Sequence, residues 1–100
     1  MVRSQSLLKD LRWLGRKHER LLLKEALRRL EQDPLASTRN MKDLRPNPVA
    51  QRELRLFGKY RLFFNVDPAE NAVTLVRAGR KRGSRLFMRG ETAPLGCLMA

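Results

Sequence analysis

Cysteine is almost absent from this chain of 100 residues, in which Cys97 is the only one. The chain can therefore form neither an internal disulfide nor a metal cluster built from several cysteines, and we expect it in a reducing compartment, the cytoplasm. The last four residues, CLMA, match the prenylation pattern formally, and we attribute this match to chance. Long apolar runs are also missing. Charges interrupt every apolar stretch of MVRSQSLLKDLRWLG, so we expect no signal peptide, no membrane span and no membrane partner.

Acidic residues are scarce. Ten Asp and Glu stand against 22 Lys and Arg, which gives a net charge of +12. A chain this basic attracts polyanions at long range, so the partner classes to weigh are nucleic acid, the ribosome, an anionic membrane and an acidic protein. Residues 1–34 hold 9 basic and 5 acidic side chains, whereas residues 35–100 hold 13 and 5. The unbalanced charge belongs to the second part of the chain.

Histidine and aromatic residues are few as well. His18 is the only histidine, and we interpret it as a solvated residue at a helix start rather than as a catalyst. The sequence has no metal-ligand spacing and no glycine-rich phosphate loop followed by a helix, so we expect no metal and no small-molecule cofactor. The exposed aromatic residues are too few for a stacking platform of the single-strand-binding kind.

Two helices are predicted at the start of the chain, at residues 5–14 and from about residue 17 to 32. Ser4 or Ser6 can cap the first, Gly15 ends it, and Asp33-Pro34 ends the second. The predicted core positions are Leu7, Leu8, Leu11, Leu14, Leu23, Ala26, Leu27 and Leu30. Leu21 and Leu22 extend the apolar stripe. Either they widen it beneath a sheet or, with Trp13, they meet a partner; we prefer the first.

Strands follow a polar connector, residues 35–49, in which Pro46 and Pro48 disfavour regular structure. The predicted strands are residues 51–57, 60–66, 72–78 and 85–88. We therefore predict an α+β fold, in which an N-terminal helical hairpin packs on one face of a small antiparallel sheet of three to four strands. One domain, residues 1–90, is followed by a short C-terminal tail, residues 91–100.

The first strand hairpin has a register that its apolar residues determine. Pairing residue 56 with 60 and residue 54 with 62 turns both apolar sets to the core and requires a three-residue loop, Phe57 to Lys59. The same register places Arg55 opposite Arg61 on the far face, beside Glu53 and Phe63. Like charges directly opposite each other are destabilising, so the two arginines either splay into water or bind an anion between them. Further cations follow at Arg77, Arg80, Lys81, Arg82, Arg85 and Arg89.

The stretch RELRLFGKYRLFFNVDPAENAVTLVRAGRKRGSRLF resembles the RelE/ParE toxin superfamily of prokaryotic toxin–antitoxin systems, as does LEQDPLASTRNMKDLR before it. The resemblance implies a cytoplasmic toxin that a cognate antitoxin neutralises. In the RelE-like branch the toxin cuts mRNA in the ribosomal A site, whereas in the ParE-like branch it poisons DNA gyrase. A third alternative is a catalytically impaired basic RNA-binding member.

The resemblance also assigns site residues. It places the phosphate-binding arginine at Arg61, a second cationic catalytic position at Lys81, and one of two basic positions at Arg55. Three features depart from the family pattern. Glu53 replaces the other basic position, Phe87 stands where a hydroxyl or imidazole is expected, and only MVRS occupies the place of the usual first strand, which we therefore expect to be missing.

Cleavage of RNA through its own 2′-hydroxyl needs a base, positive charge on the developing phosphorane and a proton donor. Arg55, Arg61 and Lys81 can supply the charge, and Glu53 is the candidate base, although neighbouring arginines would weaken it. Phe87 cannot donate a proton, which argues against full nuclease activity. The predicted phosphate-binding residues are Arg77, Arg80, Arg82, Arg85 and Arg89. We interpret the cations of residues 78–87 as one wall of a site whose other wall is Arg55 and Arg61.

Overall fold

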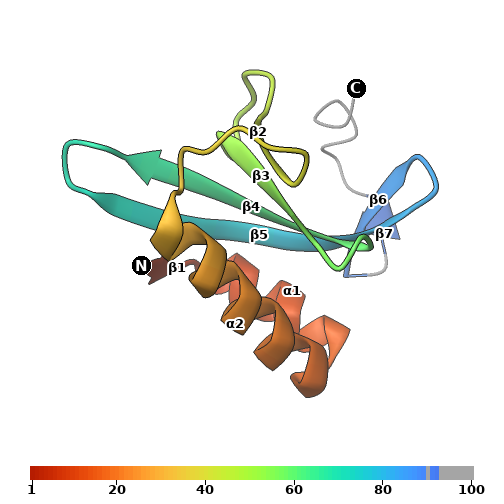
Figure 1. Ribbon diagram of the computed structural model, residues 1–100. Coiled ribbons are helices and arrows are strands. Elements are labelled where there is room, and N and C mark those ends of the chain that lie inside the picture. Colours follow the sequence, from red (N-terminus) through yellow and green to blue (C-terminus); the bar gives the residue numbers. More distant parts are fainter. Residues whose placement is uncertain (90, 93–100) are drawn as a thin grey trace.

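Two helices cover one face of a seven-stranded sheet in the computed structural model, which describes residues 1–89 and 91–92 (Figure 1). The elements are β1 (Val2–Arg3), α1 (Gln5–Leu14), α2 (Arg16–Gln32), β2 (Met41–Asp43), β3 (Arg52–Leu56), β4 (Tyr60–Asp67), β5 (Ala72–Arg82), β6 (Arg85–Met88) and β7 (Glu91–Thr92). The predicted α+β class, helical hairpin and four strands are confirmed. The CLMA motif and most of the predicted tail lie outside the described residues.

The helical hairpin begins after Ser4 and ends before Asp33, as predicted. The Ser4 hydroxyl accepts the Leu7 N–H at 3.0 Å and donates to the Val76 carbonyl of β5 at 2.6 Å, so the N-cap also ties α1 to the sheet. Gly15 alone separates the helices. Its φ of +105° lies in a region that other residues rarely adopt, which explains a glycine at so sharp a junction.

The sheet is larger than predicted, and its order is β2-β3-β4-β5-β6-β7 with β1 beside β5. The expectation that the first strand is missing is wrong, because Val2 and Arg3 pair in parallel with Thr74 and Leu75. The polar connector also contributes a strand, β2, in which Met41 pairs with Leu54. Both strands are two or three residues long, and each forms by backbone pairing with a longer neighbour rather than by its own apolar pattern.

The predicted register of the β3–β4 hairpin is confirmed. Leu56 pairs with Tyr60, Leu54 with Leu62, and Arg55 with Arg61. The loop of residues 57–59 turns through two positive φ angles, +52° at Phe57 and +71° at Gly58. A register shift between Phe63 and Phe64 then marks a β-bulge in the pairing of β4 with β5.

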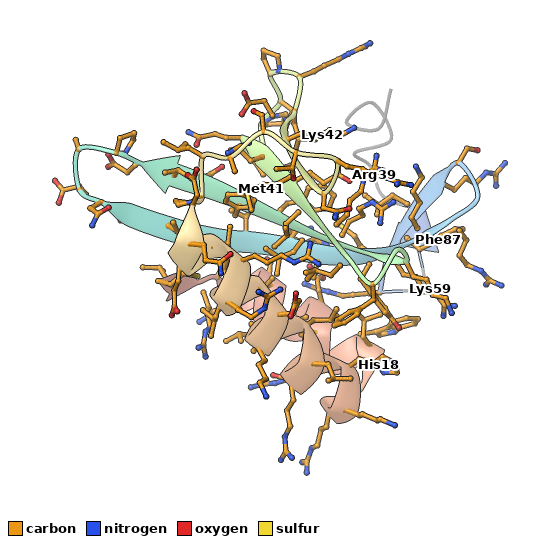
Figure 2. The ribbon with its side chains drawn as sticks, in the orientation of Figure 1. His18, Arg39, Met41, Lys42, Lys59 and Phe87 are labelled. Atoms are coloured by element: carbon orange, nitrogen blue, oxygen red, sulfur yellow. The ribbon has the colours of Figure 1, made fainter. Side chains whose placement is uncertain are left out.

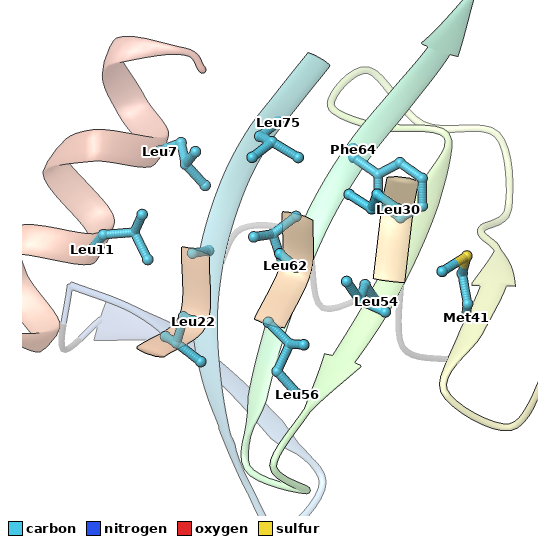
Figure 3. Packing of buried hydrophobic residues seen from close by; sticks show 12 residues of the cluster. Leu7, Leu11, Leu22, Leu30, Met41, Leu54, Leu56, Leu62, Phe64 and Leu75 are labelled. Atoms are coloured by element: carbon cyan, nitrogen blue, oxygen red, sulfur yellow. The ribbon is translucent and has the colours of Figure 1, made fainter. Parts of the chain in front are cut away.

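The main core lies between the helices and the sheet (Figure 3). On α2 the buried residues are Leu22, Ala26 and Leu30, one full turn apart. The predicted core positions Ala26 and Leu30 are thus confirmed, and Leu23 packs against the core although it is only partly buried. The prediction of Leu27 is corrected, because the helix is rotated toward Leu22 and leaves Leu27 half-buried. Leu21 is 48% exposed.

A second apolar cluster covers part of the opposite face of the sheet, which we call the outer face. Its buried members are Ala50, Phe63, Leu86 and Met88, with Leu44, Val49 and Val76 packed against them. The connector after β2 and strand β6 therefore both pack on Phe63. The part of the outer face that these segments do not cover lies near the β3–β4 turn, and its side chains are cationic.

Candidate functional site: a cationic outer face

The Arg55–Arg61 pair encloses an anion that belongs to the chain itself. Glu53 is fully buried, and its Oε1 lies 2.9 Å from Nε of Arg61 and 3.9 Å from Nε of Arg55. Neither predicted arrangement is observed, since the arginines neither splay into water nor leave the space between them to an external anion. The buried glutamate offsets the repulsion between the two guanidinium groups.

Arg61 is held from several sides and is only 5% exposed. One of its terminal nitrogens donates to the carbonyls of Gly58 and Tyr60, each at 3.0 Å, so the side chain folds back against the hairpin turn. Burial lowers the pKa of Arg61, and the positive charge of Arg55 lowers this pKa further, whereas Glu53 raises it. Arg61 therefore lies below the surface and contributes its charge from there, whereas Arg55, whose side chain is 31% exposed, can contact a ligand directly.

Lys81 shares the outer face with this pair. Arg61 pairs with Gly79, and the side-chain alternation of a strand brings Lys81 to the same face two residues later. The Lys81 N–H donates to the Lys59 carbonyl at 2.7 Å, which fixes Lys81 beside the β3–β4 turn. The predicted grouping of Arg55, Arg61 and Lys81 is thus present as a cluster of side chains on one face.

Lys42 joins this group from β2, where it pairs with Glu53. Lys42 was not among the predicted site residues, because residues 35–49 were predicted to be a connector without regular structure. We use the term cationic outer face for Lys42, Arg55, Arg61 and Lys81, with Glu53 buried among them.

Arg80, Arg82, Arg85 and Phe87 lie on the helix side of the sheet instead. Arg80 pairs with Phe87 on one side and with Tyr60 on the other, and Tyr60 packs against the main core. The interpretation of residues 78–87 as a single wall facing Arg55 and Arg61 is therefore wrong for all its cations except Lys81. A strand turns consecutive side chains to opposite faces, so a basic run cannot present all its charges to one ligand.

Phe87 accordingly faces away from Lys81 and does not occupy a place in that cluster. The β6 residues that flank it, Leu86 and Met88, are the ones on the outer face, and both are buried in the second apolar cluster. Within β6, no side chain on the outer face carries a hydroxyl or an imidazole.

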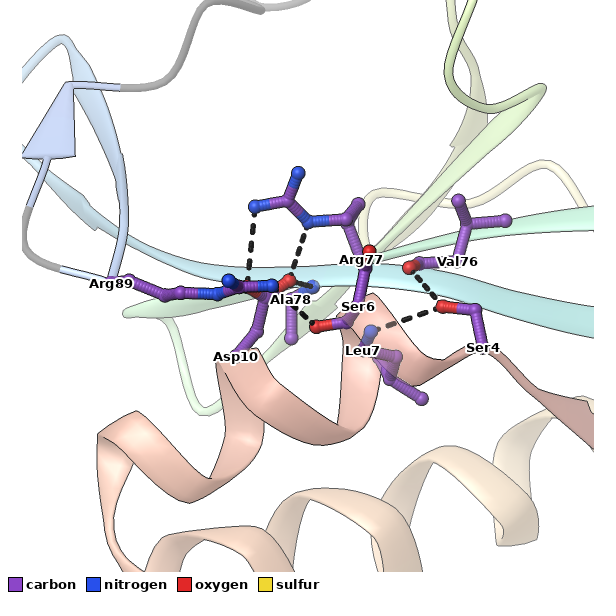
Figure 4. Close-up of polar contacts among 8 residues, drawn as sticks. All are labelled: Ser4, Ser6, Leu7, Asp10, Val76, Arg77, Ala78 and Arg89. Atoms are coloured by element: carbon purple, nitrogen blue, oxygen red, sulfur yellow. Dashed lines mark hydrogen bonds and ion pairs between the residues drawn. The ribbon is translucent and has the colours of Figure 1, made fainter.

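Arg77 and Arg89 are held by Asp10 of α1 (Figure 4). The buried Asp10 carboxylate accepts from Nε of Arg77 at 2.6 Å, from Nε of Arg89 at 2.7 Å and from the Ala78 N–H at 3.1 Å. Both arginines, which were predicted to bind phosphate, therefore tie β5 and the end of β6 to α1. The sequence signal for this was an acidic residue between Leu7 and Leu11 on the buried side of an amphipathic helix.

Other kinds of site find little support in the described part of the chain. It holds no group of three or more His, Cys, Asp or Glu side chains placed to bind a metal ion. Neither α1 nor α2 is long and apolar enough to cross a membrane. The His18 ring lies 5.7 Å from that of Tyr60, on the helix side, and so it does not belong to the cationic outer face.

Comparisons with known proteins give a fold but no family by sequence. No protein-family model matches the chain, and no curated protein matches it significantly. A chain in the crystal structure of the RelBE2 toxin–antitoxin complex from Mycobacterium tuberculosis superimposes with a TM-score of 0.65. The match covers 79% of this chain and 93% of that one at 24% identity. The protein has the fold that the resemblance to RelE toxins implied.

Proposed function

We propose that the protein is the toxin component of a toxin–antitoxin pair, of the RelE kind, and that it inhibits translation in the cytoplasm by acting on mRNA bound to the ribosome. The observation that carries the proposal is the cationic outer face, on a fold similar to that of a chain in a toxin–antitoxin complex. Two of its cations, Arg55 and Lys81, lie near the β3–β4 turn without being fully buried, so they can contact phosphates of an RNA strand.

The chemistry that this face supports is charge stabilisation. In the cleavage that we propose, the 2′-oxygen attacks the adjacent phosphorus, the bond to the 5′-oxygen breaks, and a 2′,3′-cyclic phosphate and a 5′-hydroxyl result. Arg55 and Lys81 would stabilise the charge that develops on the phosphorane, an effect typically worth about a hundredfold or more per well-placed donor. Water takes the 2′-proton and supplies the proton of the leaving oxygen.

Glu53 is unsuited to the role of base in this arrangement. Its side chain is fully buried, and its Oε1 lies against Arg61 rather than toward the surface. Among the described residues of the cationic outer face the reaction therefore lacks a side-chain base and, on the outer face of β6, a side-chain acid. We expect cleavage to be slow compared with that of a nuclease that carries both.

The partner that we propose is a cognate antitoxin. The structural neighbour is a toxin–antitoxin complex, and a net charge of +12 favours an acidic protein as the neutralising partner.

A second candidate function is inhibition of DNA gyrase without cleavage, as in the ParE-like branch. The buried Glu53–Arg61 pair and the apolar Leu86 and Met88 favour it, because a toxin that acts by protein contact needs neither an acid nor a base.

The test separates these outcomes. The chain is expressed inducibly with and without its neighbouring reading frame, and the purified protein is added to a cell-free translation reaction whose mRNA ends are then mapped. We expect growth arrest that the neighbour relieves, and new mRNA ends that depend on ribosomes. Arg55→Ala and Lys81→Ala should abolish both, whereas Lys24→Ala, which removes an exposed charge from α2, should not. If translation is intact and gyrase supercoiling is inhibited, the second candidate is established. If the protein affects neither translation nor supercoiling, both candidates are overturned.

A further inference from the structure

The aromatic residues are distributed unevenly over the molecule. Phe63 and Phe64 are buried in the two apolar clusters, and the remaining four are Trp13, Phe57, Tyr60 and Phe87. These four lie at the end where α1 meets α2 and where the β3–β4 and β5–β6 turns are found, the right-hand end of Figure 1. Figure 2 shows His18, Lys59 and Phe87 at this end. We call it the aromatic end.

The first of two grooves at this end is lined by Trp13, Leu14, Arg80, Arg82 and Phe87. Four of these five side chains end in a flat aromatic ring or guanidinium group. Trp13 is 58% exposed, and neither Arg80 nor Arg82 has an ion-pair partner in residues 1–89. Nothing in this groove therefore neutralises its positive charge.

The second groove lies between the start of α2 and the β3–β4 turn. It is lined by His18, Leu21, Leu22, Phe57, Lys59 and Tyr60. Phe57 is 56% exposed and adopts a φ of +52°, a conformation that is unusual for a bulky residue and that costs about 1 kcal/mol or more. The fold thus exposes an aromatic ring at a strained position of a turn.

The two grooves adjoin each other. Tyr60 of the second pairs with Arg80 of the first, and paired strands lie about 5 Å apart. The Lys59 carbonyl accepts the Lys81 N–H, so the second groove also adjoins the cationic outer face. The cations and the aromatic rings are on opposite faces of the sheet, so one strand of RNA that contacts both has to pass around the end of the sheet at the β3–β4 turn.

We propose that the aromatic end is a stacking site for unpaired bases of single-stranded RNA. The inference rests on the proposed function, since the strand is the same RNA whose phosphates lie on the cationic outer face. Bases stack on aromatic rings and on guanidinium planes, and groups of these two kinds line the grooves beside leucine and lysine side chains. The aromatic residues are few, as the composition shows, but their concentration at one end makes a small platform possible.

Trp13 provides a direct probe because it is the only tryptophan. Its fluorescence is measured while the protein is titrated, at one fixed salt concentration, with short oligouridine, with an abasic strand of equal length and with an oligoglutamate of equal charge. We expect oligouridine to quench the fluorescence and to bind about a hundredfold more tightly than the abasic strand, since each stacked base contributes about tenfold. Oligoglutamate should bind no better than the abasic strand. Equal binding of the two strands, or tighter binding of oligoglutamate, would overturn the proposal.

Variants locate the effect. Phe57→Leu and Phe87→Leu keep an apolar side chain and should each lower the affinity for oligouridine by about tenfold, with no change for the abasic strand. Lys81→Ala should weaken both strands alike, and Leu35→Ala, at an exposed apolar residue of the connector, should weaken neither. If the parent protein inhibits translation but Phe57→Leu and Phe87→Leu change the affinity for oligouridine no more than that for the abasic strand, only the stacking site is overturned. A quench by oligouridine without any effect on translation would instead remove the proposed function.

Discussion

The carboxylate of Glu53 lies 2.9 Å from Nε of Arg61 in the interior of the outer face, and both side chains are buried. The residue that the resemblance assigns to phosphate binding is therefore already paired with a carboxylate of its own chain. A buried pair adds little net stability, because desolvation of both charges opposes their attraction, but loss of one partner leaves the other charge uncompensated.

Glu53→Gln should therefore destabilise the protein by about 3 kcal/mol, since it leaves the Arg61 guanidinium buried without its counter-ion. Urea unfolding measures this change. Glu53→Leu combined with Arg61→Met should recover most of the lost stability, because neither charge then remains. Glu31→Gln, on the exposed surface of α2, is the control and should change stability little. A Glu53→Gln protein as stable as the parent would contradict this account of the pair.

Asp10→Asn should also cost about 3 kcal/mol, because a fully buried carboxylate with four donors around it loses its charge while Arg77 and Arg89 keep theirs. Thermal and urea unfolding would both show the loss. The control is Glu70→Gln, which removes the same charge from an exposed side chain between β4 and β5 that has no ion-pair partner in residues 1–89, and we expect only a small effect there. If the two variants were equally stable, the contacts of Asp10 would not be what holds α1 to the sheet.

Gly79→Ala should separate β6 from β5. A Cβ atom at residue 79 would lie 2.8 Å from the Phe87 carbonyl oxygen and 3.2 Å from side-chain atoms of Leu86 and Met88. Overpacking of this kind typically costs about 1–3 kcal/mol. The comparison is Gly83→Asn, at a turn with φ of +61° and open space around it, where asparagine is tolerated. Amide exchange within β6 should accelerate in the first variant alone.

Acid should remove a small contribution of α2. Hydrogen bonds from Arg28, and then from Arg29, lower the pKa of Glu25 to about 2 from its ordinary value of 4.5. A pKa that is lower in the folded state means stability that is present above pH 4.5 and is lost as the pH falls to about 2. The melting temperature of Glu25→Gln should therefore be slightly below that of the parent at neutral pH and equal to it near pH 2, and added salt should reduce the difference. A difference that persists in strong acid would refute the role of this ion pair.

Some parts of the fold were predictable because side-chain alternation determines them. In the β3–β4 hairpin only one pairing turns Leu54, Leu62 and their apolar neighbours to the core, so the register and the Arg55–Arg61 pair follow from the sequence. The short strands β1 and β2 were not predictable, since they have no pattern of their own and form against longer partners.

The site was predictable only in part. Alternation alone separates Lys81 from Arg80 and Arg82, and applying it to the basic run would have divided these cations between the two faces. The pairing of Arg77 and Arg89 with Asp10 could not be read in the same way, because it joins residues that are far apart in the chain. Charge in a sequence shows how many cations a protein has, but only the tertiary structure shows which of them are already neutralised.

The contacts of α1 with β5 have a consequence for self-association. On the side of β5 that pairs with β1 and β6, residues 76–79 have no neighbouring strand among the described elements. Such a gap is a template for strands of other molecules, and proteins commonly block it. Here Ser4 donates to the Val76 carbonyl and Asp10 accepts the Ala78 N–H, so two side chains of one helix occupy the backbone groups that a foreign strand would need. The same residues that position the helix thus protect the longest strand of the sheet from edge-to-edge aggregation.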